Sequence, residues 1–92
     1  MEEVAFKSVP SMYYKEIKGI KPFTVRIEDN QNDERFIALK KGTPKIIKII
    51  NTINGESFKR EISDISFMEM APITNEGLLI NVKIWMIAWK NQ

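Results

Sequence analysis

The sequence predicts a small, mostly-β domain of the α+β type, built as a compact β-barrel with one or two short helices. Several segments alternate apolar and polar residues with the period of two that is typical of strands. Asn54-Gly55 stands between two such segments and is the strongest short-range signal for a hairpin. The second of them, residues 56–67, changes phase midway, which requires a bulge near Ser63-Asp64. Such bulges bend long strands around a barrel.

The length and composition fit one domain covering residues 1–92. The chain has 92 residues, of which 43% are apolar, and this is enough for one core but not for two. It contains no cysteine and no histidine, which excludes disulfides, thiolate or imidazole metal ligands, and Ser-His or Cys-His nucleophile pairs. We expect no metal and no cofactor. The acidic N-terminus and the lack of a long apolar run predict a cytoplasmic protein without a membrane partner.

The first third of the chain predicts a strand followed by a helix. Residues 4–7 form a short strand candidate. Ser11 is a candidate N-cap for a helix carried by residues 14–18, and Gly19 ends it.

The next elements are a strand and a second, shorter helix. Phe23–Ile27 alternates apolar and polar residues, so we expect a strand with one solvated face. Residues 28–34 form a polar loop, in which Asp33 caps a helical turn at 34–40 that Gly42 closes.

The second half of the chain is predicted to be all strand and turn. Residues 45–51 are rich in isoleucine and pair with residues 56–67 across the Asn54-Gly55 turn. Residues 68–76 contain Pro72 and are predicted to form a loop. Leu78–Trp89 then closes the chain as a strand with one apolar and one mixed face, as expected for a strand that lines a barrel.

Charge is unevenly distributed along the chain, although the net charge is only +2. Residues 35–60 carry seven basic side chains against one acid, and residues 61–76 carry four acids and no base. This pattern predicts a basic side of the domain, which is either a solvated strand face or a surface that attracts nucleic acid. The candidate nucleic-acid contacts are Lys45, Lys48, Lys59 and Arg60.

One octapeptide, Gly19-Ile20-Lys21-Pro22-Phe23-Thr24-Val25-Arg26, joins the predicted helix to the following strand. Pro22 favours an extended Lys21, and Thr24 and Arg26 share parity, so both point to one face of the strand. Two cations flanking a hydroxyl suit an anionic or amide-bearing ligand. The alternative is that Thr24 is an ordinary strand residue and that the two cations are exposed or pair with Glu16 and Glu28.

The octapeptide reads G-x-K-x-x-T-x-R and resembles the G-x-K-x-x-E-x-R signature of ASCH domains, a branch of the PUA-like barrels. The resemblance covers most of the chain in the order of elements and rests on Gly19, Lys21, Thr24 and Arg26 in residues. It implies a PUA-like barrel with a positive cleft that binds RNA or a nucleotide or nucleoside through Lys21, Thr24 and Arg26.

Thr24 departs from the glutamate found in most of that family. A group of small ASCH proteins that remove the acetyl group from 4-acetylcytidine also has threonine at this place. Similarity to them implies Lys21 as the catalytic base and Thr24 as the nucleophile. Their acid is a glutamate from a later loop, for which Glu76, or Glu69 in its place, is the candidate here.

The sequence therefore leaves three functions open. The first is a module that binds RNA or a nucleotide at the octapeptide, helped by the basic residues. The second is an amidohydrolase acting on an acylated nucleoside. The third is a protein-interaction module that uses Trp85, Trp89 and their neighbours. These two tryptophans either stack on bases or pack in the core, and core packing is favoured.

Overall fold

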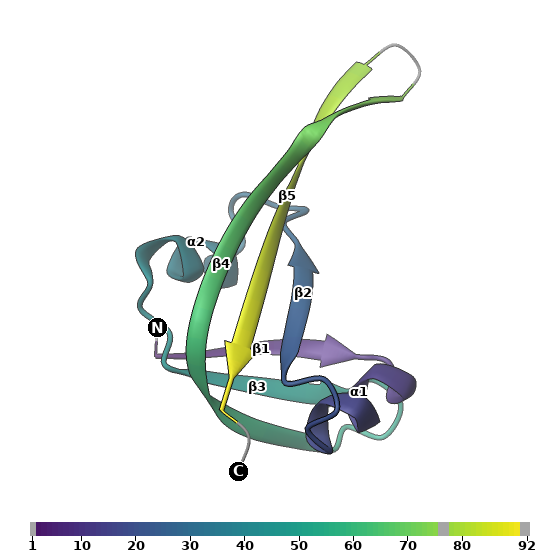
Figure 1. Cartoon of the computed structure of the whole chain (residues 1–92), viewed down its shortest axis with the longest axis vertical. Helices are drawn as coiled ribbons and strands as arrows, with labels where there is room; N and C mark the ends of the chain where they lie inside the picture. Colours follow the sequence, from purple (N-terminus) through teal and green to yellow (C-terminus); the bar gives the residue numbers. More distant parts are fainter. Residues whose placement is uncertain (1, 76–77, 91–92) are drawn as a thin grey trace.

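The computed structural model describes the backbone of residues 2–75 and 78–90, and the side chains of residues 2–70 and 81–90. It is a mostly-β fold: one five-stranded sheet, in the order β1-β3-β4-β5-β2, curls into a half-barrel accompanied by two helices (Figure 1). The predicted fold class is confirmed. The elements are β1 (Glu3–Ser8), α1 (Pro10–Ile17), β2 (Phe23–Ile27), α2 (Glu34–Lys41), β3 (Ile46–Asn51), β4 (Ser57–Asn75) and β5 (Leu78–Trp89).

A bulge in β4 divides the sheet into two halves. Before the bulge, β4 pairs with β3 as far as Glu61, and from Ile62 onward it pairs with β5. The register shifts between Ile62 and Asp64, where the phase change of the sequence predicted it. A strand that passes from one sheet to another through a bulge forms a corner. Figure 1 shows the result: β1 and β3 lie across the base, while β4, β5 and β2 run along the length of the molecule.

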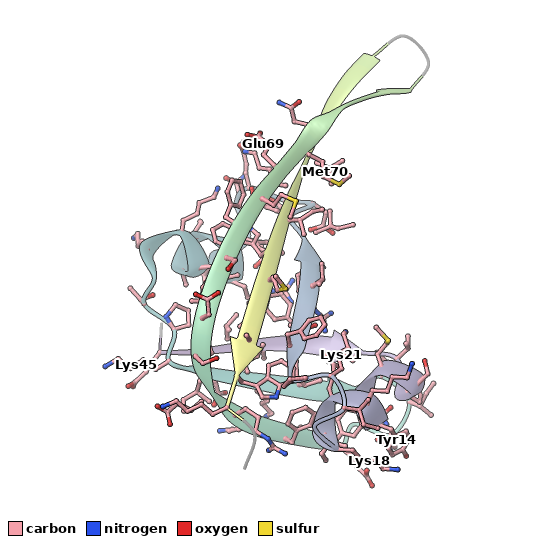
Figure 2. All side chains as sticks on the ribbon, viewed as in Figure 1. Tyr14, Lys18, Lys21, Lys45, Glu69 and Met70 are labelled. Atoms are coloured by element: carbon pink, nitrogen blue, oxygen red, sulfur yellow. The ribbon has the colours of Figure 1, made fainter. Side chains whose placement is uncertain are left out.

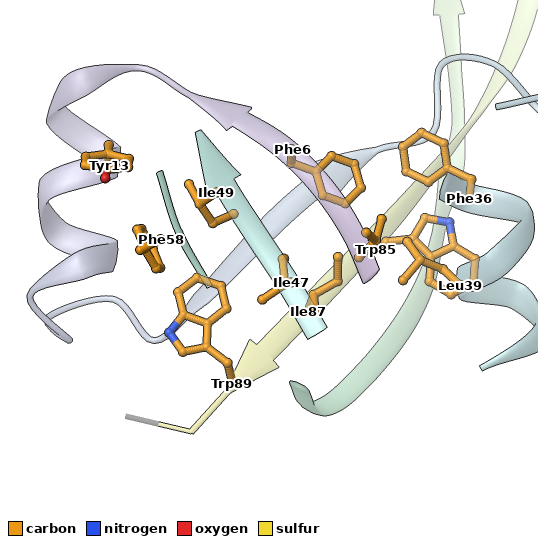
Figure 3. Close-up of a cluster of buried hydrophobic side chains, with 11 residues drawn as sticks. Phe6, Tyr13, Phe36, Leu39, Ile47, Ile49, Phe58, Trp85, Ile87 and Trp89 are labelled. Atoms are coloured by element: carbon orange, nitrogen blue, oxygen red, sulfur yellow. The ribbon is translucent and has the colours of Figure 1, made fainter. Parts of the chain in front are cut away.

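The core fills the angle between the two halves of the sheet. Alternate residues of β1, β3 and β5 point inward, as a period of two requires. Trp85 and Trp89 are only 5% and 4% exposed and belong to this core, so they offer no surface for a base or a protein (Figure 3). The other members of the cluster are Val4, Phe6, Tyr13, Phe36, Leu39, Ile47, Ile49, Phe58 and Ile87.

The mixed face of β5 therefore faces the core, and its apolar face lies outside. Met86 is 40% exposed beside Ile84 on this outer face. The alternation in the sequence predicted the strand correctly. It could not show which face is buried, because both faces carry apolar residues.

Helix α1 begins earlier than predicted. Val9, not Ser11, is its N-cap, and Pro10 takes the first position. Proline suits this place because its fixed φ fits a helix and its missing N–H has no partner there. In α2 the prediction is confirmed: the Asp33 carboxylate accepts a hydrogen bond of 2.9 Å from the Arg35 N–H, and Gly42 closes the helix with φ +68°.

The predicted loop at residues 68–76 is wrong. β4 continues to Asn75 and pairs with β5 back to Leu78. The ladder is irregular between Met70 and Ile73, and bulges are where a strand tolerates a proline such as Pro72. The result is a long two-stranded arm that projects beyond the body of the domain (Figure 1).

Candidate functional site

β1 and β2 are the two edge strands of the sheet, and they face each other at its open side. We call this opening the seam, and the Arg26 side chain bridges it. Its Nη1 donates to the Lys7 carbonyl oxygen at 2.7 Å, and its Nη2 donates to Ser8 Oγ at 2.8 Å. Its Nε donates to Thr24 Oγ1 at 2.9 Å. One guanidinium group thus links β2 to β1 where no backbone ladder does so.

A cavity of about 240 Å³ opens at this seam. The three side chains that the octapeptide predicted, Lys21, Thr24 and Arg26, all line it. The tight connection from α1 to β2 brings Lys21 beside the strand, and shared parity puts Thr24 and Arg26 on the same face. The remaining lining residues are Lys7, Ser8, Val9, Met12 and Val25.

Thr24 is a buried, oriented hydroxyl rather than a solvated strand residue. Its side chain is 2% exposed, and the charged Nε of Arg26 donates to it. Burial lowers the pKa of Arg26, Glu16 opposes that effect, and the positive charge of Arg35 adds to it. Arg26 therefore lies in a partly dehydrated setting close to another cation, where a bound anion gains more than it does in water.

Glu16 is the carboxylate that the structure places at this site. It is 1% exposed, and Lys21 Nζ lies 3.7 Å from its Oε2. Neither of its carboxylate oxygens has a hydrogen-bond partner among the described residues. The sequence suggested Glu16 only as a surface partner for Lys21. No local signal shows its burial, because this depends on how α1 packs against β3.

Of the two predicted acids, Glu69 does not join the site. Glu69 is exposed on β4, paired across the ladder with Lys83 in the projecting arm. Figure 2 places it far along the arm from Lys21. The reason is the extension of β4, which carries Glu69 away on a strand instead of returning it in a loop. Glu76 lies outside the described residues.

The four predicted basic residues do not form one cluster. Lys48 and Lys59 pair across β3 and β4, and Lys59 is held 2.7 Å from a carboxylate oxygen of Glu3. Arg60 turns to the other side, stacks 4.7 Å from the Phe58 ring and donates to the Ile17 carbonyl oxygen. Lys45 is exposed just before β3, and none of the four residues lines the cavity.

A second, larger cavity of about 720 Å³ continues along the seam. Arg26 and Arg35 both line it, and both guanidinium groups pack on the Phe6 ring, at 5.0 and 4.6 Å from its centre. The sequence did not single out Phe6 or Arg35. The only sequence signal for the place of Arg35 was the capping pair Asp33-x-Arg35, which fixes Arg35 at the start of α2.

An apolar hollow of about 330 Å³ lies on the outer face of the sheet. Exposed apolar surface of this kind is what a protein-interaction module needs. The hollow does not involve the two tryptophans. Its lining residues are Val25, Ser66, Phe67, Met68, Ile84 and Met86.

Comparisons with known proteins identify no relative of this chain. No family model matches the chain, and neither the curated proteins nor the solved structures provide a match. In the described part of the chain, neither helix is long and apolar enough to cross a membrane.

Proposed function

We propose that this chain is an ASCH-like, PUA-like domain that binds RNA or a nucleotide or nucleoside at the octapeptide. One observation carries the proposal: Lys21, Thr24 and Arg26 line a single cavity together with Lys7 at the open seam of the half-barrel. Three cations and an oriented hydroxyl around one hollow suit a ligand that combines negative charge with polar edges. Nucleotides have this combination, since phosphates attract cations and base edges accept and donate hydrogen bonds.

The charges at the seam also favour binding over simple solubility. Lys21 is only partly exposed, and its ammonium group forms an ion pair with Glu16 at 3.7 Å that is not a hydrogen bond. Lys21 therefore stays in its ion pair with the buried Glu16, while its ammonium N–H groups remain available to a ligand phosphate.

Lys21→Ala is expected to weaken the binding of short single-stranded RNA more than Lys15→Ala. Both variants remove one positive charge from the same region, but Lys15 is exposed on α1 and does not line the cavity. Each phosphate contact releases counterions, so losing one lowers the slope of log affinity against log salt by about 0.7 for a single strand. The measurement is fluorescence anisotropy with labelled RNA from about 50 to 200 mM salt.

Two results would contradict the proposal. If the two variants lose affinity equally, only the net charge of the domain matters. If the intact protein binds no RNA, nucleotide or nucleoside in this salt range, the cavity does not have the proposed role.

A second function, amide hydrolysis of 4-acetylcytidine, is favoured by the bond between Arg26 Nε and Thr24 Oγ1. A guanidinium N–H at 2.9 Å from the Thr24 hydroxyl oxygen favours loss of its proton, because it stabilises the alkoxide that attacks. Thr24 Oγ1 would bond to the acetyl carbon, and its proton would pass through Lys21 Nζ to the departing cytidine amine. Water would then release acetate and restore the hydroxyl. Binding ranks first, because no hydrogen bond joins Lys21 to Thr24 among the described contacts and Glu69 is remote.

Thr24→Val is expected to abolish any release of cytidine from 4-acetylcytidine while the domain stays folded. Valine keeps the branched shape of threonine and removes only the hydroxyl. Thr52→Val makes the same change at an exposed turn and is expected to keep full turnover. Chromatography of cytidine over time measures the rates. Turnover that persists in Thr24→Val, or is absent from the intact protein, leaves binding as the function.

A further inference from the structure

We propose that the larger cavity of the seam, between Arg26 and Arg35, binds the phosphate group of a nucleotide whose nucleoside part occupies the smaller cavity. The inference rests on the proposed function and specifies its ligand as a phosphorylated nucleotide rather than a free nucleoside. It assigns a binding role to Phe6 and Arg35, which lie outside the octapeptide.

The first support is the fixed geometry of the two guanidinium groups. Both lie against the Phe6 ring, which is itself 3% exposed and held in the core. Arg26 is further fixed by its three hydrogen bonds, and Arg35 by the Asp33 carboxylate at 2.6 Å and the Ala5 carbonyl oxygen at 3.2 Å. A ligand therefore meets two guanidinium groups that are already oriented, and its binding does not have to immobilise flexible side chains.

The second support is the number of donors left over. A guanidinium group has five N–H bonds. Nε of Arg26 and one N–H on each of its terminal nitrogens are used, which leaves two for a ligand. Arg35 likewise uses its Nε–H and one N–H on each terminal nitrogen, and also keeps two. Planar forks of this kind are the preferred partners of phosphate oxygens.

The third support is charge. Lys7, Arg26 and Arg35 line the cavity against Asp29 alone, and Asp33 pairs with Arg35 from the side. No carboxylate forms a hydrogen bond with Arg26 among the described contacts. Two neighbouring cations that are only partly neutralised repel each other, and a phosphate placed between them relieves that repulsion.

The two cavities adjoin at Lys7, Val25 and Arg26, which line both. A nucleoside in the smaller cavity would therefore present its phosphate to the larger one, with Arg26 between them. Arg26 contacts both the Thr24 hydroxyl and the Phe6 ring, on which Arg35 also packs.

The test compares each of the four ribonucleosides with its 5′-monophosphate by isothermal titration calorimetry on the full chain. We expect at least one monophosphate to bind about tenfold more tightly than its nucleoside, the gain of roughly one charge-assisted contact. Arg35→Ala is expected to remove that preference and leave the nucleoside affinity unchanged. Lys41→Ala, which removes an exposed charge from the other end of α2, is expected to keep the preference.

Two further variants test the phosphate site if Arg35→Ala does not fold. Arg35→Lys keeps the charge but not the fork, so it is expected to retain only part of the preference. Asp33→Asn keeps a capping oxygen but removes the carboxylate that holds the Arg35 guanidinium in place, so it is expected to weaken the preference. A matching series of dinucleotides shows whether a diester satisfies the site as well as a terminal phosphate.

The outcomes separate the two proposals. If neither nucleosides nor nucleotides bind, and RNA does not bind either, the proposed function fails. If nucleosides and nucleotides bind equally, or if Arg35→Ala, Arg35→Lys and Asp33→Asn leave the preference unchanged, the smaller cavity keeps its role and the phosphate site is overturned.

Discussion

Trp89→Ala is expected to lower the free energy of unfolding by about 3–5 kcal/mol, as large aromatic truncations in a core do. Trp89 is 4% exposed, and its ring lies 6.1 Å from that of Phe58 in an edge-on contact. It is also near the end of β5, where the two halves of the sheet meet the core. The free energy of unfolding of a small domain is only about 5–15 kcal/mol in total, so the variant should be largely unfolded in mild denaturant.

Met86→Ala is the matched control for this variant. Met86 lies on the same strand but on the outer face, where it is 40% exposed, so its loss is expected to cost less than about 1 kcal/mol. Urea denaturation followed by circular dichroism measures both. Equal midpoints for the two variants would mean that Trp89 is not in the core, and would restore it as a candidate surface residue.

Arg26→Ala is expected to have the second large effect, on both stability and binding. It removes three hydrogen bonds and leaves the buried oxygens of Ser8 and Thr24 without that donor, a loss of about 2–4 kcal/mol in unfolding free energy. It also removes one of the three residues that line both cavities. Ligand binding should therefore fall below detection under conditions where the variant remains folded.

Arg60→Ala separates these two effects. Arg60 also stacks on a phenylalanine and also donates to backbone oxygens, but it lies away from both cavities. It is expected to lose stability and to bind normally. If Arg26→Ala, kept folded at low temperature, binds as well as Arg60→Ala, then the seam is not the ligand site.

Much of the fold could be predicted because its signals are local. The limits of β2 and β5, the Asp33 cap of α2 and the bulge near Ser63-Asp64 each follow from a few adjacent residues. The same is true of the octapeptide, whose tight turn brings Lys21 to the cavity that Thr24 and Arg26 line.

The rest depended on contacts between distant segments. The parallel pairing of β1 with β3 has no local signal, and it determines which strands form the seam. The burial of Glu16 and the meeting of Arg26 with Arg35 on Phe6 depend on that pairing. Pro72 predicted a loop at residues 68–76, but a proline at an irregular point of the ladder did not end the strand.

The bridge made by Arg26 also affects how the chain behaves toward its own copies. An unpaired strand edge is a template on which another chain can add a strand, and such addition leads to aggregation. β1 and β2 are the two edges of this sheet, and the Arg26 guanidinium occupies the Lys7 carbonyl oxygen on β1. The charged side chain thereby blocks an acceptor that an incoming strand would need. The residue at the centre of the proposed site thus also leaves the β1 edge with one acceptor fewer for strand addition.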